Sequence, residues 1–161
     1  MTYSADTRFL EQAQQLGYSF DGEIKIGGNY VPLVRDGHHV YVSGQIPRVG
    51  NALVVTGAVG AEVSLADAQK AAKVCVMRSL ALLQRALGSL AHIQSVPRIT
   101  VYVQSAPNFT QQSEVADGAS EVLFQVLGAQ AGAHSRTSVG VLQLPKNAAV
   151  EIDLIASVRP D

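Results

Sequence analysis

The chain has 161 residues, a length that fits one domain with a substantial hydrophobic core. Only 16% of the residues are charged and the net charge at pH 7 is −1, so the sequence lacks the basic surface that nucleic-acid binding requires. No apolar run is long enough to span a membrane, and the low charge content predicts that another subunit covers part of the surface.

The N-terminal segment predicts a short helix that packs against the rest of the chain. Within residues 7–16, apolar side chains fall on one side of a helix: Phe9, Leu10, Ala13 and Leu16. Gly17 ends this helix. Residues 1–26 are interpreted as an extension of a single domain that covers residues 1–161. This end has no signal-peptide core, and the single cysteine, Cys75, fits a reducing compartment, so a cytoplasmic protein is expected.

Several segments in the first half of the chain have the composition of strands. They are residues 22–28, 30–34, 40–47 and 51–59, the first as an edge strand and the last as a short hairpin piece. Gly44 interrupts the third segment. A glycine inside a strand marks either a bulge or a place where another backbone or a ligand comes close.

Two longer helices are also predicted. The first begins after Ser64, whose side chain can cap it, and ends at Gly88. One face of this helix is rich in small residues and can lie close to a sheet. Cys75 falls on that face and is interpreted as a buried structural thiol rather than a nucleophile. The second helix covers residues 109–127 and is broken by Gly128.

The C-terminal part of the chain predicts a β-hairpin. Residues 137–142 and 150–158 are rich in Val, Ile, Leu and Thr, and the residues 144–147 between them, Leu-Pro-Lys-Asn, have turn composition. A further strand is predicted over residues 96–104. Together these elements predict an α+β fold in which two helices lie on one face of a sheet.

Two charged residues stand out at this end of the chain, because Arg136 opens one apolar strand and Glu151 opens the next. The four histidines lack metal-ligand spacing, and no phosphate-binding glycine loop or nucleophile elbow occurs, so neither a metal site nor a nucleotide cofactor is predicted. From composition alone, the interpretation of Arg136 and Glu151 as ordinary surface residues is favoured.

Four motifs in one order give these residues a context. They are YVSGQIP at residues 41–47, PRITVYVQ followed by Asn-Phe over residues 97–109, Ser-Arg-Thr at 135–137, and LPKNAAVEI at 144–152. Together they resemble the RidA/YjgF family, also named endoribonuclease L-PSP, from about residue 29 to residue 158. The extension at residues 1–26 is similar to that of a longer subgroup. The resemblance implies a chorismate-mutase-like α+β fold with a mixed sheet, and a homotrimer with clefts between subunits.

The resemblance also implies roles for individual residues. Arg136 matches the arginine that binds the carboxylate of a 2-imino acid, and Glu151 matches the acid that holds the hydrolytic water. Gly44 matches the glycine whose backbone N–H faces the ligand, and Tyr30 matches an aromatic wall of the cleft. Ser138 stands at a substrate-binding position where many members have cysteine.

One part of the family pattern is missing. Short members carry an Asn and a Tyr on the second helix, and neither has a clear match in this chain. Ser113 or Asp117 are the candidates for that place, which leaves the size and identity of the substrate open.

The implied reaction is hydrolysis of reactive 2-imino acids to 2-oxo acids and ammonia. A protonated imine is already electrophilic, so a positioned carboxylate, a water and a base suffice, with no metal or cofactor. The expected partners are a small carboxylate and two further copies of the chain. Two alternatives remain: a non-catalytic module that binds small carboxylates in the same cleft, and a ribonuclease, against which the near-neutral charge stands.

The predicted hairpin also bears on how the site is assembled. In that hairpin Arg136 and Glu151 are offset by about six residues, or roughly 20 Å along the strands. A small substrate does not bridge this distance. The sequence therefore predicts that Arg136 of one subunit shares a cleft with Glu151 or Tyr30 of the next.

Overall fold

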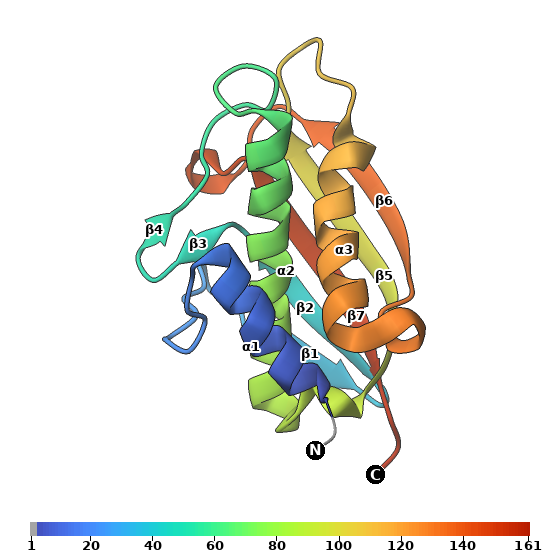
Figure 1. Cartoon of the computed structure of the whole chain (residues 1–161). Helices are drawn as coiled ribbons and strands as arrows, with labels where there is room; N and C mark the ends of the chain where they lie inside the picture. Colours follow the sequence, from blue (N-terminus) through green and yellow to red (C-terminus); the bar gives the residue numbers. More distant parts are fainter. Residues whose placement is uncertain (1–2) are drawn as a thin grey trace.

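The computed structural model describes residues 3–161, in which alternating apolar side chains build a five-stranded sheet (Figure 1). Its strands are β1 (Leu33–Asp36), β2 (His39–Gln45), β5 (Ile93–Gln104), β6 (His134–Val141) and β7 (Val150–Val158). They lie in the order β1-β2-β7-β5-β6, with β5 and β6 parallel and the other neighbours antiparallel. The expected mixed sheet is confirmed. A separate two-stranded hairpin joins β3 (Arg48–Val49) and β4 (Ala52–Leu53).

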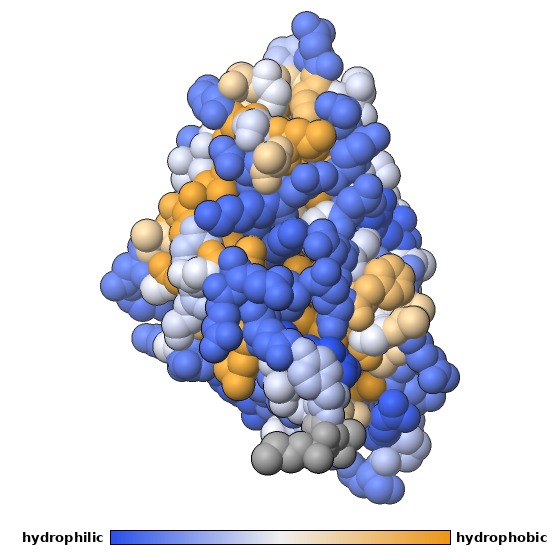
Figure 2. Space-filling model, viewed as in Figure 1, coloured by the Kyte–Doolittle hydropathy of each residue, from blue (hydrophilic) through white to orange (hydrophobic). Residues whose placement is uncertain are grey.

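The helices cover one face of the sheet (Figure 1). The long helices α2 (Leu65–Leu87) and α3 (Gln112–Ala131) pack on the strands. Helix α1 (Ala5–Leu16) lies on these two helices as an outer layer. Short 3₁₀ turns, η1 (Leu90–His92) and η2 (Pro145–Asn147), precede β5 and β7. In the space-filling view the surface over α1 is largely hydrophilic, as its position outside the core requires (Figure 2).

Local signals account for the boundaries and packing of α2. The Ser64 hydroxyl accepts a hydrogen bond from the Asp67 N–H at 3.1 Å, and Gly88 ends the helix with φ +84°. Cys75 is fully buried, and that burial raises the pKa of its thiol, so the residue is structural as predicted. Helix α3 lies very close to α2: a Cβ on Gly118 would come within 2.5 Å of the Gln69 carbonyl oxygen.

The predicted C-terminal hairpin is wrong. Strand β5 lies between β6 and β7: Ile99 pairs with Arg136 on one side and with Leu154 on the other. The turn at residues 145–147 exists as η2, yet the strands on either side of it do not pair with each other. Strand β6 instead runs parallel to β5 and reaches it through α3, which is the kind of crossover that a parallel pair needs.

Three smaller expectations need correction. Residues 22–28 form no strand, because α2 arginines take up their backbone acceptors: Arg85 donates to the Gly22 carbonyl at 2.7 Å and Arg78 to the Lys25 carbonyl at 3.2 Å. The hairpin expected over residues 51–59 is formed by β3 and β4 instead. Helix α3 starts at Gln112 rather than residue 109, whereas the expected break at Gly128 is confirmed, because this residue has φ +89° and kinks the helix.

On the sheet face opposite the helices, some side chains are covered by no other element of the described chain. Val34, Tyr41 and Val139 on this face are each more than a third exposed. Within residues 3–161, no helix combines the length and apolar composition needed to cross a membrane.

Candidate active site

A bulge in β2 brings its backbone against Glu151. The pairing of β2 with β7 shifts register between Val42 and Gln45, so Gly44 lies in the bulge. A Cβ on Gly44 would lie 3.0 Å from Cδ of Glu151. The absence of a side chain on Gly44 is therefore what allows the Glu151 carboxyl to rest against this backbone.

Beside this contact lies a cavity of about 220 Å³. Three of the five predicted site residues line it together: Tyr30, Gly44 and Glu151. Its other walls come from the segment before β1, the end of β2, the start of the β3–β4 hairpin, η2 and one residue of α2: Lys25, Ile26, Gly27, Gln45, Ile46, Arg48, Arg78, Pro145 and Lys146. The volume suits a small metabolite.

The surroundings of Glu151 favour a proton acceptor. Partial burial, and secondarily the negative charge of Asp153, raises the pKa of the Glu151 carboxyl above its ordinary value. Asp153 accepts a hydrogen bond from the Tyr102 hydroxyl at 3.1 Å. A carboxylate with an elevated pKa is a stronger base than an ordinary one and can activate water.

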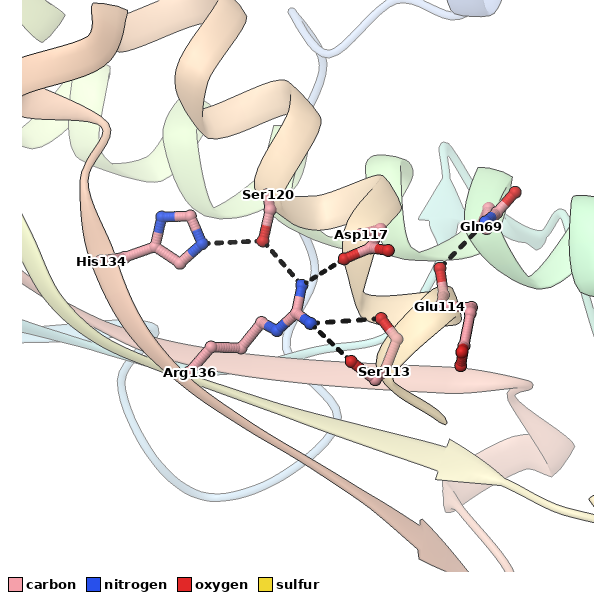
Figure 3. A network of polar contacts seen from close by, with 7 residues as sticks. All are labelled: Gln69, Ser113, Glu114, Asp117, Ser120, His134 and Arg136. Atoms are coloured by element: carbon pink, nitrogen blue, oxygen red, sulfur yellow. Dashed lines mark hydrogen bonds and ion pairs between the residues drawn. The ribbon is translucent and has the colours of Figure 1, made fainter. Parts of the chain in front are cut away.

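Arg136 lies elsewhere, on the helix side of the edge strand β6 (Figure 3). Its Nη1 donates to Asp117 Oδ1 and to Ser120 Oγ, both at 2.9 Å, and its Nη2 donates to Ser113 Oγ at 2.9 Å. Ser113 and Asp117 are the two residues that the sequence offered in place of the family's Asn and Tyr on the second helix. Both accept hydrogen bonds from the Arg136 guanidinium. The Asp117 carboxylate is therefore paired with Arg136 within this chain.

A histidine fixes the orientation of Ser120 in this network. The His134 Nδ1–H donates to the Gly132 carbonyl at 2.6 Å, because a carbonyl oxygen only accepts. His134 Nε2 then accepts from the Ser120 hydroxyl at 2.7 Å, which leaves the Ser120 oxygen turned toward Arg136 (Figure 3). These contacts hold the guanidinium in one position.

The sheet separates Arg136 from Glu151. Val150 and Ile152, on either side of Glu151, are fully buried beneath the helices, so the alternation of β7 turns Glu151 to the opposite face. Arg136 points to the helix face and bonds to α3. The hairpin register predicted from the sequence is wrong. Arg136 and Glu151 are separated because they face opposite sides of the sheet, not because they are offset along a hairpin. Ser138 follows Arg136 on the helix side of β6 and does not line the cavity of Glu151.

Among the cavity residues that sequence reasoning missed are two arginines, Arg48 and Arg78. Arg78 is only 4% exposed. A signal for it existed, because Arg78 follows Cys75 by three residues and so falls on the same helical face. An arginine among small buried residues is unusual enough to mark a site.

Comparison with known proteins agrees with the motifs. The family model described as endoribonuclease L-PSP matches residues 21–158. Protein TCP17 of Trypanosoma cruzi is 37% identical over 159 residues, which cover 99% of each chain.

Solved structures give the same result. Atu1372 of Agrobacterium tumefaciens, a protein of unknown function, is 38% identical with a TM-score of 0.85, covering 96% of this chain and 94% of its own. A Shewanella oneidensis protein named as a candidate endoribonuclease is 25% identical with a TM-score of 0.85, covering 93% and 99%. The chain belongs to the endoribonuclease L-PSP family, the family of the YjgF and Rid proteins.

Proposed function

We propose that this protein hydrolyses small 2-imino acids to 2-oxo acids and ammonia. The observation that carries the proposal is the Glu151 carboxyl at the cavity wall, held against the Gly44 backbone with a raised pKa. Among residues 3–161 no side chain or backbone N–H donates a hydrogen bond to this carboxyl, so its oxygens are available to a water molecule.

The chemistry needs few groups. Glu151 takes a proton from water while the oxygen attacks the carbon of the protonated imine, giving a tetrahedral carbinolamine. The amine then receives the proton held by Glu151 and leaves as ammonia, which takes up the hydroxyl proton as the carbonyl forms. The overall balance is protonated imine plus water to 2-oxo acid plus ammonium, without oxidation or reduction.

The substrate carboxylate needs a cation to bind it. Arg136 stands at the position of the arginine that has this role in the RidA/YjgF family. Since Arg136 and Glu151 face opposite sides of one sheet, we place the site between subunits, with Arg136 from a neighbour. The exposed side chains Val34, Tyr41 and Val139 on the open sheet face support subunit contact there. A homotrimer is the proposed assembly, with three such clefts.

A second candidate is a binding module without catalysis. The observation that favours it is the Asp117 carboxylate already seated on Arg136. A ribonuclease fits less well, because the cavity of about 220 Å³ suits a metabolite rather than a polymer and the net charge is −1.

The test is an amino-acid oxidase that generates 2-iminopropanoate in the presence of semicarbazide, which traps the imine. Wild-type protein is expected to lower semicarbazone formation and speed the appearance of pyruvate. Arg136→Lys, which keeps the charge but loses the planar two-pronged grip, should abolish this effect without unfolding the chain. Wild-type protein with no effect on either rate would support the binding module.

A further inference from the structure

The cavity beside Glu151 carries more positive charge than imine hydrolysis requires. Four basic residues line it, Lys25, Arg48, Arg78 and Lys146, against one acidic residue, Glu151. Within residues 3–161 the ion pairs are Lys73–Glu121 and Arg136–Asp117, so none of these four cations has a carboxylate partner.

Arg78 is the innermost of the four. Its guanidinium is held by neutral acceptors only: the Gln45 side-chain oxygen at 3.1 Å, the Arg48 carbonyl at 2.7 Å and the Lys25 carbonyl at 3.2 Å. These bonds tie the two neighbouring cations to the cavity wall through their backbones. The charge itself stays uncompensated at 4% exposure, an arrangement that is costly unless an anion joins it.

Arg48 is a second, independent indication that the cavity binds an anion. Its Nε–H is buried and has no hydrogen-bond partner among the described residues. A buried donor without an acceptor costs free energy, and such a group at a cavity wall indicates a missing acceptor.

Lys146 is presented by a strained turn. Lys146 and Asn147 have positive φ values of 58° and 61°, unusual for residues other than glycine. The buried Gln104 side chain holds the turn: its oxygen accepts from the Leu144 N–H and its amide donates to Asn147 Oδ1, both at 2.7 Å. A turn with a strained backbone therefore places Lys146 at the cavity.

We infer that this cavity binds a second carboxylate of the substrate, so that the substrates are 2-imino dicarboxylic acids. The inference rests on the proposed function, in which Arg136 of a neighbour takes the carboxylate next to the imine. Arg48 and Lys146 then take the distal carboxylate, while Arg78 holds the wall in place. The cavity volume of about 220 Å³ matches a molecule of amino-acid size.

Two product analogues of equal chain length test this. 2-Oxoglutarate and 2-oxopentanoate differ only in the distal carboxylate, and calorimetric titration of the assembled protein gives the dissociation constant of each. Wild type should bind 2-oxoglutarate at least about tenfold more tightly. Arg48→Gln should remove most of that preference. Arg159→Gln, the same change at the residue after β7 and about 26 Å from Glu151 along the extended chain, should keep it.

The outcomes separate the two proposals. Equal affinity for the two acids, or no binding of either, overturns the distal site. Inorganic phosphate binding more tightly than 2-oxoglutarate overturns the assignment to a carboxylate. Rapid hydrolysis of 2-iminopentanoate without preference for 2-iminoglutarate removes the distal site and keeps the deaminase. Tight 2-oxoglutarate binding without hydrolysis of either imine keeps the distal carboxylate site and removes the deaminase.

Discussion

Gly44 and Glu151 are in contact across the β2–β7 pair, and a methyl group on Gly44 would come within 3.0 Å of the Glu151 carboxyl carbon. The position of the proposed base therefore depends on the absence of a side chain at residue 44.

Gly44→Ala tests this contact. The methyl group should push the Glu151 carboxyl from its place and lower kcat/KM for imine hydrolysis about 10- to 100-fold, with the fold kept. Gly22→Ala is the matched control, because nothing lies within 4 Å of a Cβ there. Circular dichroism verifies folding, and equal activity of the two variants would contradict the role of the contact.

Glu151→Gln should lose activity and gain stability at pH 7. The folded-state pKa of Glu151 is raised, so the ionised carboxylate destabilises the fold at pH values above that pKa. Glutamine removes this cost, so Tm at pH 7 should rise by a few degrees. Below the unfolded-state pKa, near pH 4, the glutamate is protonated in both states and the gain should vanish. A variant less stable than wild type at pH 7 would show that the carboxylate stabilises the fold.

Asp153→Asn should move the acid limb of the activity profile to lower pH. Glu151 must be ionised to accept a proton from water, and the charge of Asp153 is the second cause of its raised pKa. Removal of that charge lowers the pKa, so activity should persist to lower pH. Asp36→Asn, a change on the edge strand β1, should leave the limb in place. An unmoved limb in Asp153→Asn would assign it to another group.

Asp117→Asn should strengthen binding of monocarboxylates. Asp117 forms an exposed ion pair with Arg136 at 2.9 Å, and such pairs contribute little to stability. Without this competitor, pyruvate should bind about two- to fivefold more tightly by calorimetry. Glu121→Gln, which breaks the Lys73 pair on the same helix, is the control. Weaker binding in Asp117→Asn would mean that Asp117 orients Arg136 instead of competing for it.

Local patterns in the sequence explain much of this fold. Alternation identified β2, β5 and β7, and capping by Ser64 with a stop at Gly88 identified α2. The hairpin failed for a physical reason: Pro145-Lys-Asn147 makes a turn, but the partner of a strand is decided by hydrogen bonds to residues far away in the chain. Here β5 supplied those bonds to both strands.

The site was predictable only where motifs exist. Tyr30, Gly44 and Glu151 follow from the family motifs and line one cavity. Arg48 and Arg78 belong to no motif. The position of Arg78 on the helical face of Cys75 is a signal for it, whereas Arg48 cannot be told from a surface residue until its burial is known. The Asp117–Arg136 pair likewise depends on how α3 lies over β6.

The most direct test of a site shared between subunits is complementation. Arg136→Ala and Glu151→Ala are each expected to be inactive, and the two proteins are denatured together, mixed in equal amounts and refolded. In a randomly mixed trimer about one cleft in four receives Arg136 from one variant and Glu151 from the other. The account predicts recovery of about a quarter of the wild-type rate, and a mixture that stays inactive despite verified exchange of subunits would contradict it.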